Sequence, residues 1–273
     1  MSNAAFPRLG FLGGGKMATA LVQGLLAAKL TTADRIIASD VAAAARSALE
    51  KATGIRTTAE NRVVVAESDA LILAVKPQVM APVLAEIKPA LTSKHLVISI
   101  AAGISLKQLS DGLGTDRRII RVMPNTPCLV GASASAFALG SAASPEDGAL
   151  VERILQAVGR AFQLPEHLLD AVTGLSASGP AFVAVVIEAL SDGGVRMGLP
   201  RDVAMALAAQ TVFGTAKMIL EAGLHPAQLK DMVASAGGTT IAGLHALERG
   251  GVRAALMDTV EAATKRAAEL GKG

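Results

Sequence analysis

The most constraining feature of this sequence is the glycine-rich stretch between Arg8 and Leu26. An apolar run from Leu9 to Leu12 predicts a short buried strand, and three consecutive glycines, Gly13–Gly15, end it. From Lys16 onward the apolar residues recur with helical spacing. A strand that passes through glycines directly into a helix predicts a β–turn–α unit at this point.

The residue types of this turn fit a phosphate site. The spacing Gly13-x-Gly15-x-x-Ala18 is the dinucleotide-binding fingerprint with alanine in its third position. Gly13 permits the tight turn, Gly15 lets a pyrophosphate approach the backbone, and Ala18 lets helix and strand pack closely. The free N–H groups at the helix start then face the phosphates. A plain turn is the alternative, and the flanking strand and helix favour the nucleotide site.

Strands and helices keep alternating through the first half of the chain. Further strands are expected at Arg35–Ser39, Ile55–Thr58, Ala70–Val75, Leu96–Ile100, Arg118–Met123 and Arg160–Leu164. Helices of about 10–15 residues between apolar strands are typical of a parallel sheet covered on both faces. We therefore expect an α/β fold whose N-terminal domain, residues 1-165, is a Rossmann-like doubly wound parallel sheet.

Ligands of such sheets bind outside the carboxyl ends of the strands. Five of these ends should meet in one crevice; they are Gly13–Gly15, Ser39-Asp40, Ala74–Pro77, Ala101–Gly103 and Pro124–Pro127. Lys76 fits either a phosphate contact or a strand end. Asn125-Thr126, between two prolines, fits either a nicotinamide contact or a simple turn.

Ser39 and Asp40 follow the second strand, about 25 residues after the glycines, where a ribose-reading residue is expected. A carboxylate there accepts from both ribose hydroxyls of NAD and repels a 2′-phosphate, whereas a serine admits the phosphate. With both residue types adjacent, the site does not decide between the cofactors. Asp40 also fits the N-cap of a helix over 42–51.

The second half lacks strand signals and predicts helices. Five are expected, over 181–192, from Pro200 to about Glu221, from Pro226 to about Ser235, and over 240–248 and 253–270. The first should stop at Gly193-Gly194. Several are apolar on more than one face, so the bundle cannot bury itself alone. We expect residues 166-273 to form an all-α dimerisation domain; an intrachain core is the alternative.

Between the third and fourth of these helices lies Ser235-Ala-Gly-Gly-Thr-Thr240. Glycines followed by hydroxyl residues at a helix start can form a nest of free N–H groups for a carboxylate or phosphate. An ordinary turn between helices with Thr as N-cap is the alternative.

Composition excludes several classes of partner. The 273 residues are 51% hydrophobic, with no Trp or Tyr, and the net charge of +3 comes from scattered basic residues. Without an aromatic-interleaved basic patch, nucleic acid is not expected as a partner. No uninterrupted apolar run reaches the roughly 18 residues of a membrane helix, so no membrane is expected either. The surplus apolar surface is better assigned to a subunit interface.

Cysteine and histidine usage points away from metals and disulfides. Cys128 is single, and none of the four histidines has a Cys or acidic partner at metal spacing, so no metal site is expected. No charged region followed by an apolar one marks a signal peptide, and a cytoplasmic enzyme is the expectation. Without Tyr, a proton donor would be Thr, Ser, Lys, His or water.

Taken together, several stretches resemble the pyrroline-5-carboxylate reductase family. In order they are Gly10–Ala18, Ala74–Pro77, Ala101–Gly103, Arg121–Pro127, Asp170–Phe182, Gly193–Pro200 and Gly237–Thr240. They extend over nearly the whole chain, and Asp170–Phe182 and Ser235–Glu248 are highly specific to the family. The resemblance strongly favours the anion nest at Gly237–Thr240.

The resemblance implies hydride transfer from NADPH, with NAD(H) also possible, to the C=N carbon of 1-pyrroline-5-carboxylate, giving L-proline. It also implies an interlocked homodimer, and such dimers often assemble further into decamers. Gly237, Gly238 and Thr239, with Thr240, would hold the substrate carboxylate through N–H groups, and the Thr240 hydroxyl would lie near the ring nitrogen as the catalytic group. Glu166 matches a position near the product.

The cofactor contacts expected from the fingerprint, the strand ends and the resemblance are Leu12, Gly13, Gly14, Gly15, Lys16, Met17, Ala18, Ser39, Asp40, Asn61, Ala74, Val75, Lys76, Pro77, Ala101, Ala102, Asn125 and Thr126. Asn61 matches a family position at the adenosine ribose or its phosphate. Asp40 departs from the family, whose members often carry a small or basic residue there, and Ala236 replaces a usual Pro. Asp40 puts the NADPH preference in question.

Three other functions compete with this one. A reductase of a related cyclic imine would share all of these residues. A β-hydroxyacid dehydrogenase normally carries a catalytic Lys early in its helical domain, and no Lys occurs between Ser176 and Lys217. A non-catalytic dinucleotide-binding regulatory protein would not need the Gly237–Thr240 turn.

Overall fold

The computed structural model describes residues 6–271, which divide into two compact units. The first contains the described residues up to 178 together with those from 263 onward, and the second contains 179–262. This division differs from the expected domain limits, 1-165 and 166-273. At residues 166–178 the difference arises because helix α7 (Leu169–Val172) packs on the sheet: Leu169 is fully buried against Ala136 and Ala138.

The first unit is built on one eight-stranded sheet of order β3-β2-β1-β4-β5-β6-β7-β8. Neighbouring strands are parallel except β6 and β7, which are antiparallel. The strands are β1 (Leu9–Leu12), β2 (Ile36–Ser39), β3 (Arg56–Thr58), β4 (Ala70–Leu73), β5 (Leu96–Ser99), β6 (Arg118–Met123), β7 (Ser133–Leu139) and β8 (Gly159–Gln163). The expected Rossmann-like α/β fold is confirmed, and the antiparallel pairing of β7 with β6 is a departure from the all-parallel sheet that was expected.

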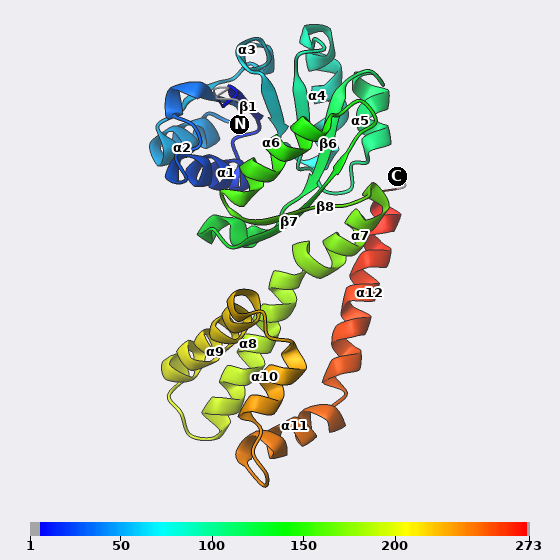
Figure 1. The fold of residues 1–273 in the computed structure, drawn as a ribbon. Helices are drawn as coiled ribbons and strands as arrows, with labels where there is room; N and C mark the ends of the chain where they lie inside the picture. The colour runs from blue at the N-terminus through cyan, green and yellow to red at the C-terminus, as the bar shows by residue number, and fades with distance from the viewer. Residues whose placement is uncertain (1–5, 272–273) are drawn as a thin grey trace. The chain divides into compact units, whose positions relative to one another are not determined.

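Helices cover both faces of this sheet (Figure 1). They are α1 (Lys16–Ala27), α2 (Ala43–Thr53), α3 (Asn61–Glu67), α4 (Met80–Ile87), α5 (Leu106–Leu113) and α6 (Pro145–Gln156). One buried core joins α1, α2 and α6 to strand residues such as Phe11, and the other joins α3, α4 and α5 to residues such as Leu12. Because adjacent strand residues point to opposite faces, strands buried on both sides are apolar throughout.

Strand β7 is not among the strands expected from the sequence. Its sequence, Ser-Ala-Ser-Ala-Phe-Ala-Leu, has few of the branched and aromatic residues that favour strands. It pairs with β6, placing Phe137 opposite Val122 and Leu139 opposite Ile120. The small residues fit because α7 packs closely on this part of the sheet, through Leu169.

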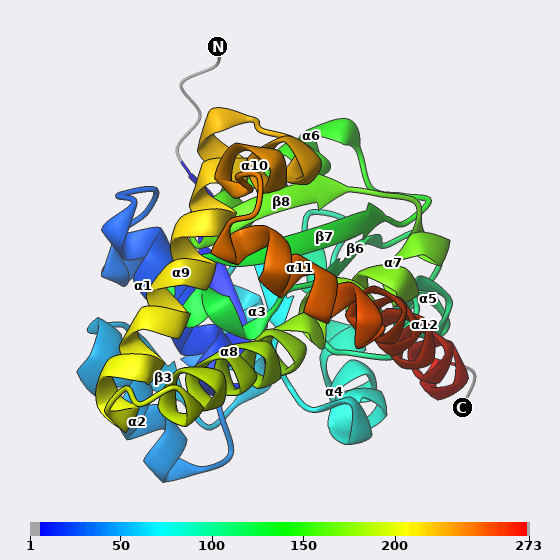
Figure 2. The same cartoon turned by 90° about the horizontal axis from the view of Figure 1, so that it is seen from below.

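The second unit contains α8 (Gly179–Arg196), α9 (Arg201–Ala222), α10 (Pro226–Val233), α11 (Thr239–Arg249) and the first part of α12 (Val252–Leu270). The expectation that the first helix stops at Gly193-Gly194 is wrong, since α8 continues to Arg196. A Cβ at Gly194 would lie 3.2 Å from Ala204 Cβ on α9. That glycine therefore serves close packing between α8 and α9, which lie side by side (Figures 1 and 2).

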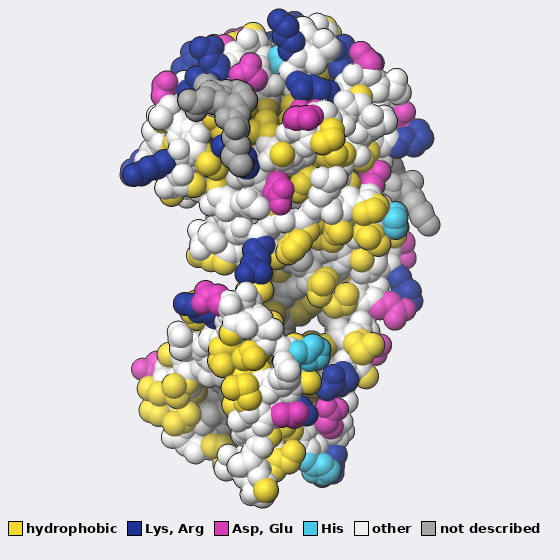
Figure 3. All heavy atoms as spheres, in the orientation of Figure 1, with side chains coloured by type: hydrophobic (Ala, Val, Ile, Leu, Met, Phe, Trp, Pro, Cys, Tyr) yellow, Lys and Arg dark blue, Asp and Glu magenta, His cyan; other side chains and the backbone are white. Residues whose placement is uncertain are grey.

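The second unit has almost no core of its own. Its buried residues are Ser191, Ala204, Ala208 and Leu229. Large apolar side chains are exposed instead, including Phe213 at 60% and Met257 at 68%, and Figure 3 shows hydrophobic side chains on the surface of this unit. A surface of this kind is typical of a subunit interface.

By length and composition alone, two helical runs, Glu166–Arg196 and Arg201–Ala222, could also cross a membrane. Each contains charged residues, so neither is an uninterrupted apolar run. Of their most apolar windows, 6% and 11% of residues are buried in the structure. These are the same exposed helices whose surface suits a subunit interface.

Gly24→Ala should destabilise the first unit, although alanine favours helices by about 1 kcal/mol. The added Cβ would lie 2.2 Å from Val158 Cγ1 and 2.9 Å from the Ala157 carbonyl oxygen. Overpacking of this kind costs about 1–3 kcal/mol, so thermal unfolding should show a melting temperature lowered by several degrees. Gln23→Ala, at an exposed position of the same helix, should change it little; equal melting temperatures for both variants would contradict this packing.

Candidate functional site

The carboxyl ends of four neighbouring strands are joined by backbone hydrogen bonds. The Gly13 N–H donates to the Ser39 carbonyl at 2.8 Å, and the Ala74 N–H donates to the Leu12 carbonyl at 2.8 Å. The Ile100 N–H donates to the Leu73 carbonyl at 3.1 Å. The ends of β2, β1, β4 and β5 thus form one continuous edge. The strand order reverses between β1 and β4, and such a switch point is where ligands of open α/β sheets bind.

The glycine turn at this edge provides the space that a diphosphate needs. Gly13 has φ +105°, and a Cβ on it would lie 2.6 Å from the Ala74 carbonyl oxygen, so only glycine fits. Gly15, in contrast, is exposed, and no atom lies within 4 Å of a Cβ built on it. It is the N-cap of α1, with no side-chain cap and no acidic residue in the first turn. The first turn of α1 therefore offers its N–H groups to an anion.

Asp40 is tied to this turn. Its Oδ2 accepts from the Gly14 N–H at 2.8 Å, and its Oδ1 accepts from the Ala42 N–H at 2.9 Å. The N-cap of α2 is Ala42, so the expectation that Asp40 caps this helix as its N-cap residue is wrong. The carboxylate instead connects the end of β2 to the glycine turn and is half-buried there. Its bonding puts a negative charge beside the expected ribose position.

Ser39 and Asn61, the other expected ribose contacts, bond to each other. The Ser39 hydroxyl donates to Asn61 Oδ1 at 2.6 Å, and Asn61 Nδ2 donates to Glu86 Oε2 at 2.7 Å. Ser39 is buried, at 1% exposure. Since the Ser39 proton is used by Asn61 and the side chain is buried, this hydroxyl offers no proton to a phosphate.

Asn125 has a structural use in the chain. Its Nδ2 donates to the Ser176 carbonyl at 3.0 Å, and its Oδ1 accepts from the Ser133 hydroxyl and the Ala134 N–H, each at 3.0 Å. The side chain is buried, whereas Thr126 after it is exposed. Asn125 therefore shapes the loop after β6, and Thr126 is the residue of this pair with an accessible side chain.

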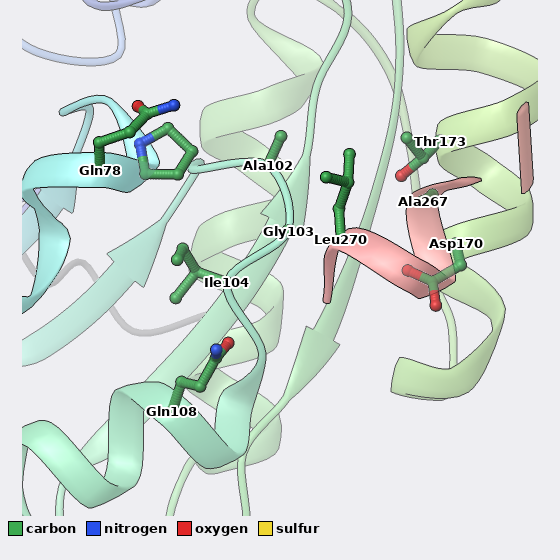
Figure 4. Close-up of a pocket in the computed structure, with 10 residues that line it drawn as sticks. Gln78, Ala102, Gly103, Ile104, Gln108, Asp170, Thr173, Ala267 and Leu270 are labelled. Carbon is green, nitrogen blue, oxygen red and sulfur yellow. The ribbon is translucent and has the colours of Figure 1, made fainter. Parts of the chain in front are cut away.

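A cavity of about 410 Å³ opens beside two of the expected contacts, Pro77 and Ala102. Its remaining lining residues are Gln78, Gly103, Ile104, Gln108, Asp170, Thr173, Ala267 and Leu270, all in the first unit (Figure 4). Of these side chains, only Asp170 carries a formal charge. The neighbouring Ala74 and Val75 are half-buried and Lys76 is exposed.

Glu166, the expected product-side residue, has two partners in the first unit. Its Oε1 accepts from Arg121 Nη1 at 3.1 Å and from the Leu106 N–H at 2.7 Å. Arg121 Nη2 also lies 3.6 Å from Asp170 Oδ1. The carboxylate of Glu166 is thus engaged with a buried guanidinium and with the first residue of α5.

The Gly237–Thr240 turn belongs to the second unit. Gly237 has φ +66°, and the Gly238 N–H donates to the Ser235 carbonyl at 3.1 Å. Gly238 is the N-cap of α11 and has no side-chain cap, so the alternative of a Thr N-cap is wrong. Thr239 and Thr240 are the first two helical residues, the former exposed and the latter half-buried. The first-turn N–H groups of α11 therefore remain available to an anion.

Cys128 lies against α1, with its Sγ 3.2 Å from Met17 Sδ. Burial raises the pKa of the Cys128 thiol, so at neutral pH it stays protonated and is a poor nucleophile. Across residues 6–271, no group of three or more His, Cys, Asp and Glu side chains is placed to hold a metal ion.

Three charged residues near the expected site were not singled out from the sequence. Arg46 Nη1 donates to the carbonyls of Asp40 and Val41, Glu86 accepts from Asn61, and Arg121 pairs with Glu166. Arg121 could have been noticed in the sequence, because it is a charged residue among the apolar residues that follow Arg118 in this strand. Arg46 and Glu86 could not have been, because both occur on half-exposed helix surfaces where such residues are ordinary.

Family models match both halves of the chain. Residues 166–270 match the model described as pyrroline-5-carboxylate reductase dimerisation. Residues 8–103 match the model described as NADP oxidoreductase, coenzyme F420-dependent.

Individual relatives match nearly the full length. A pyrroline-5-carboxylate reductase of Methanosarcina acetivorans is 52% identical over 97% of this chain and 98% of its own, and one of Glycine max is 47% identical over 96% and 95%. The Coxiella burnetii pyrroline-5-carboxylate reductase structure is 35% identical, with a TM-score of 0.93, covering 98% of this chain and 100% of its own. The Plasmodium falciparum enzyme with NADP bound is 32% identical, with a TM-score of 0.87 over the same shares. The chain belongs to the pyrroline-5-carboxylate reductase family.

Proposed function

We propose that the protein reduces 1-pyrroline-5-carboxylate to L-proline, the last step of proline biosynthesis. The observation that carries this proposal is the near full-length similarity, at 52% identity, to a relative of that name. The uncapped turn at Gly237–Thr240 supports it, because the substrate carries a carboxylate that such a turn can bind.

NADPH supplies the hydride when it is bound. The first-turn N–H groups of α1, from Lys16 to Ala18, would bind the diphosphate above the open space at Gly15. Ser39, Asp40 and Asn61 would contact the adenosine ribose. The remaining strand ends would orient the nicotinamide; their residues are Ala74, Val75, Lys76, Pro77, Ala101, Ala102, Asn125 and Thr126.

The substrate would be held by the second unit. The N–H groups of Gly237, Thr239 and Thr240 would bind its carboxylate, and Gly238, whose N–H donates to the Ser235 carbonyl, would shape the turn. The Thr240 hydroxyl would lie near the ring nitrogen. A protonated imine already carries its proton, so it needs a hydrogen-bond partner rather than a strong acid. Catalysis then rests mainly on the placement of hydride donor and acceptor, which a chain without Tyr can provide.

The assembly that we propose is a homodimer built through the second unit, with further assembly into a decamer. Its support is the dimerisation model that matches residues 166–270 and the exposed apolar helices there. We also propose a cytoplasmic enzyme that acts on no nucleic acid and no membrane. A related cyclic imine as substrate is the second candidate, since the carboxylate site and hydride donor would be the same.

Thr240→Ala should lower kcat for proline formation about 10- to 100-fold, because the ring nitrogen loses its hydrogen-bond partner. Purified protein is mixed with pyrroline-5-carboxylate and NADPH, then NADH, while the absorbance of the reduced nicotinamide is followed. The Kd of NADPH should stay unchanged. Thr259→Ala, which removes a hydroxyl bonded to the Ala255 carbonyl on α12, is the matched control; unchanged turnover in Thr240→Ala would remove this residue from the mechanism.

Asp40→Ser should raise the ratio of kcat/KM for NADPH to that for NADH by about tenfold, because it removes a carboxylate that repels a 2′-phosphate. We expect the unmodified chain to use NADH as well as NADPH. The two kcat/KM values are measured under the same conditions for both proteins. If the ratio does not move, Asp40 serves the glycine turn alone.

Gly15→Ala should weaken dinucleotide binding without loss of stability, because its Cβ enters open space that the diphosphate would occupy. Gly13→Ala should instead lower the melting temperature, since φ is +105° and the Cβ would meet the Ala74 carbonyl. Titration of NADPH and thermal unfolding of the free protein separate the two effects. Full NADPH affinity in Gly15→Ala would place the diphosphate elsewhere.

A further inference from the structure

Strand β6 carries a buried charge that the proposed reaction does not use. Arg121 points to the sheet face covered by α5, and its side chain is 6% exposed. Burial of a guanidinium costs free energy unless the group is paired, so the partners of Arg121 must be held in place beside it. Its Nε has no partner in the described structure, so the charge of the guanidinium is balanced through Nη1 and Nη2, by Glu166 and Asp170.

The two carboxylates come from one short segment at the start of the dimerisation match. Glu166 Oε1 lies 3.1 Å from Arg121 Nη1, and Asp170 Oδ1 lies 3.6 Å from Nη2. Each acidic side chain is 32% exposed, so each reaches inward from the surface to the buried cation. One positive and two negative charges make up this cluster, which we call the Arg121 cluster.

Glu166 extends the Arg121 cluster to the sheet edge where the nicotinamide would lie. The same Oε1 accepts from the N–H of Leu106 at 2.7 Å, and Leu106 is the first residue of α5. Ser105 and Gln108 form a separate capping box at this helix start. Glu166 thus supplies a partner to an N–H group that the capping box leaves without one.

The loop before α5 is consequently held at both ends. The Ile100 N–H binds the Leu73 carbonyl, and the Leu106 N–H binds Glu166. Between them lie Ala101 and Ala102, two of the residues proposed to orient the nicotinamide. Ala102, Gly103 and Ile104 line the same cavity as Asp170 (Figure 4).

We propose that Arg121, Glu166 and Asp170 are positioning residues, which hold the loop over 101–105 where the nicotinamide must lie for hydride transfer. Glu166 then acts through Arg121 and Leu106 rather than by binding the substrate itself. This inference rests on the proposed function, because the loop's task is placement of the hydride donor. Small displacements of such groups can lower rates up to about 100-fold.

The test compares Glu166→Gln, Arg121→Lys and their double variant with Asp147→Asn. Asp147 is the matched control. It pairs at 2.9 Å with Arg118, which lies on β6 three residues before Arg121. Each single variant of the Arg121 cluster should lower kcat about tenfold, with the Kd of NADPH and the KM of pyrroline-5-carboxylate changed less than about threefold. The double variant should be nearly as active as the singles, since both changes break one unit. Asp147→Asn should lower the melting temperature and leave kcat unchanged.

Different outcomes overturn the proposal. If Glu166→Gln raises the KM for pyrroline-5-carboxylate and Arg121→Lys does not, and the effects of the two changes add in the double variant, then Glu166 is a substrate ligand. An unchanged kcat in both would make the cluster purely structural. If Arg121→Lys does not fold, Asp170→Asn replaces it. If the unmodified protein does not reduce pyrroline-5-carboxylate, the proposed function fails, and the fluorescence of bound NADPH in each variant still reports whether the nicotinamide environment depends on the cluster.

Discussion

The close approach of Gly13 to Ala74 is the constraint on which the site depends. Strands β1 and β4 are adjacent although two strands separate them in the sequence, and their ends meet where a side chain on Gly13 would strike the Ala74 carbonyl. This contact lets β1 turn at once into α1, so that the helix start faces outward from the sheet edge. The hydrogen bonds that Gly13 donates to Ser39 and Gly14 donates to Asp40 follow from the same turn.

Much of the first unit could be predicted because its strands are continuous apolar runs. The bounds of Leu9–Leu12 and Arg118–Met123 agree with the structure, since each run ends at glycine or proline. Strand β7 could not be predicted from the sequence, because alanine and serine have little preference for strands. Gly193-Gly194 was misinterpreted for a related reason: a glycine that stops a helix and one that lets two helices approach look alike in sequence.

For the site, the sequence predicted residue types better than their partners. The turn residues and strand ends were found from spacing, and the substrate turn from family resemblance. The bonds of Asp40 to Gly14, of Asn125 to Ser133 and Ser176, and of Glu166 to Arg121 join residues 26, 8, 51 and 45 positions apart. Such pairings depend on the tertiary arrangement, and no local pattern in a single sequence encodes them.

The sparse burial in the second unit bears on how the chain reaches its folded state. Four buried side chains, three of them serine or alanine, give an isolated subunit little to offset the entropy of ordering these helices. For a protein that pairs through this unit, folding and association become one process, and stability depends on protein concentration. Newly made subunits at low abundance would then expose their helices to proteases until a second copy arrives, so the amount of active enzyme would rise more steeply than the amount of chain synthesised.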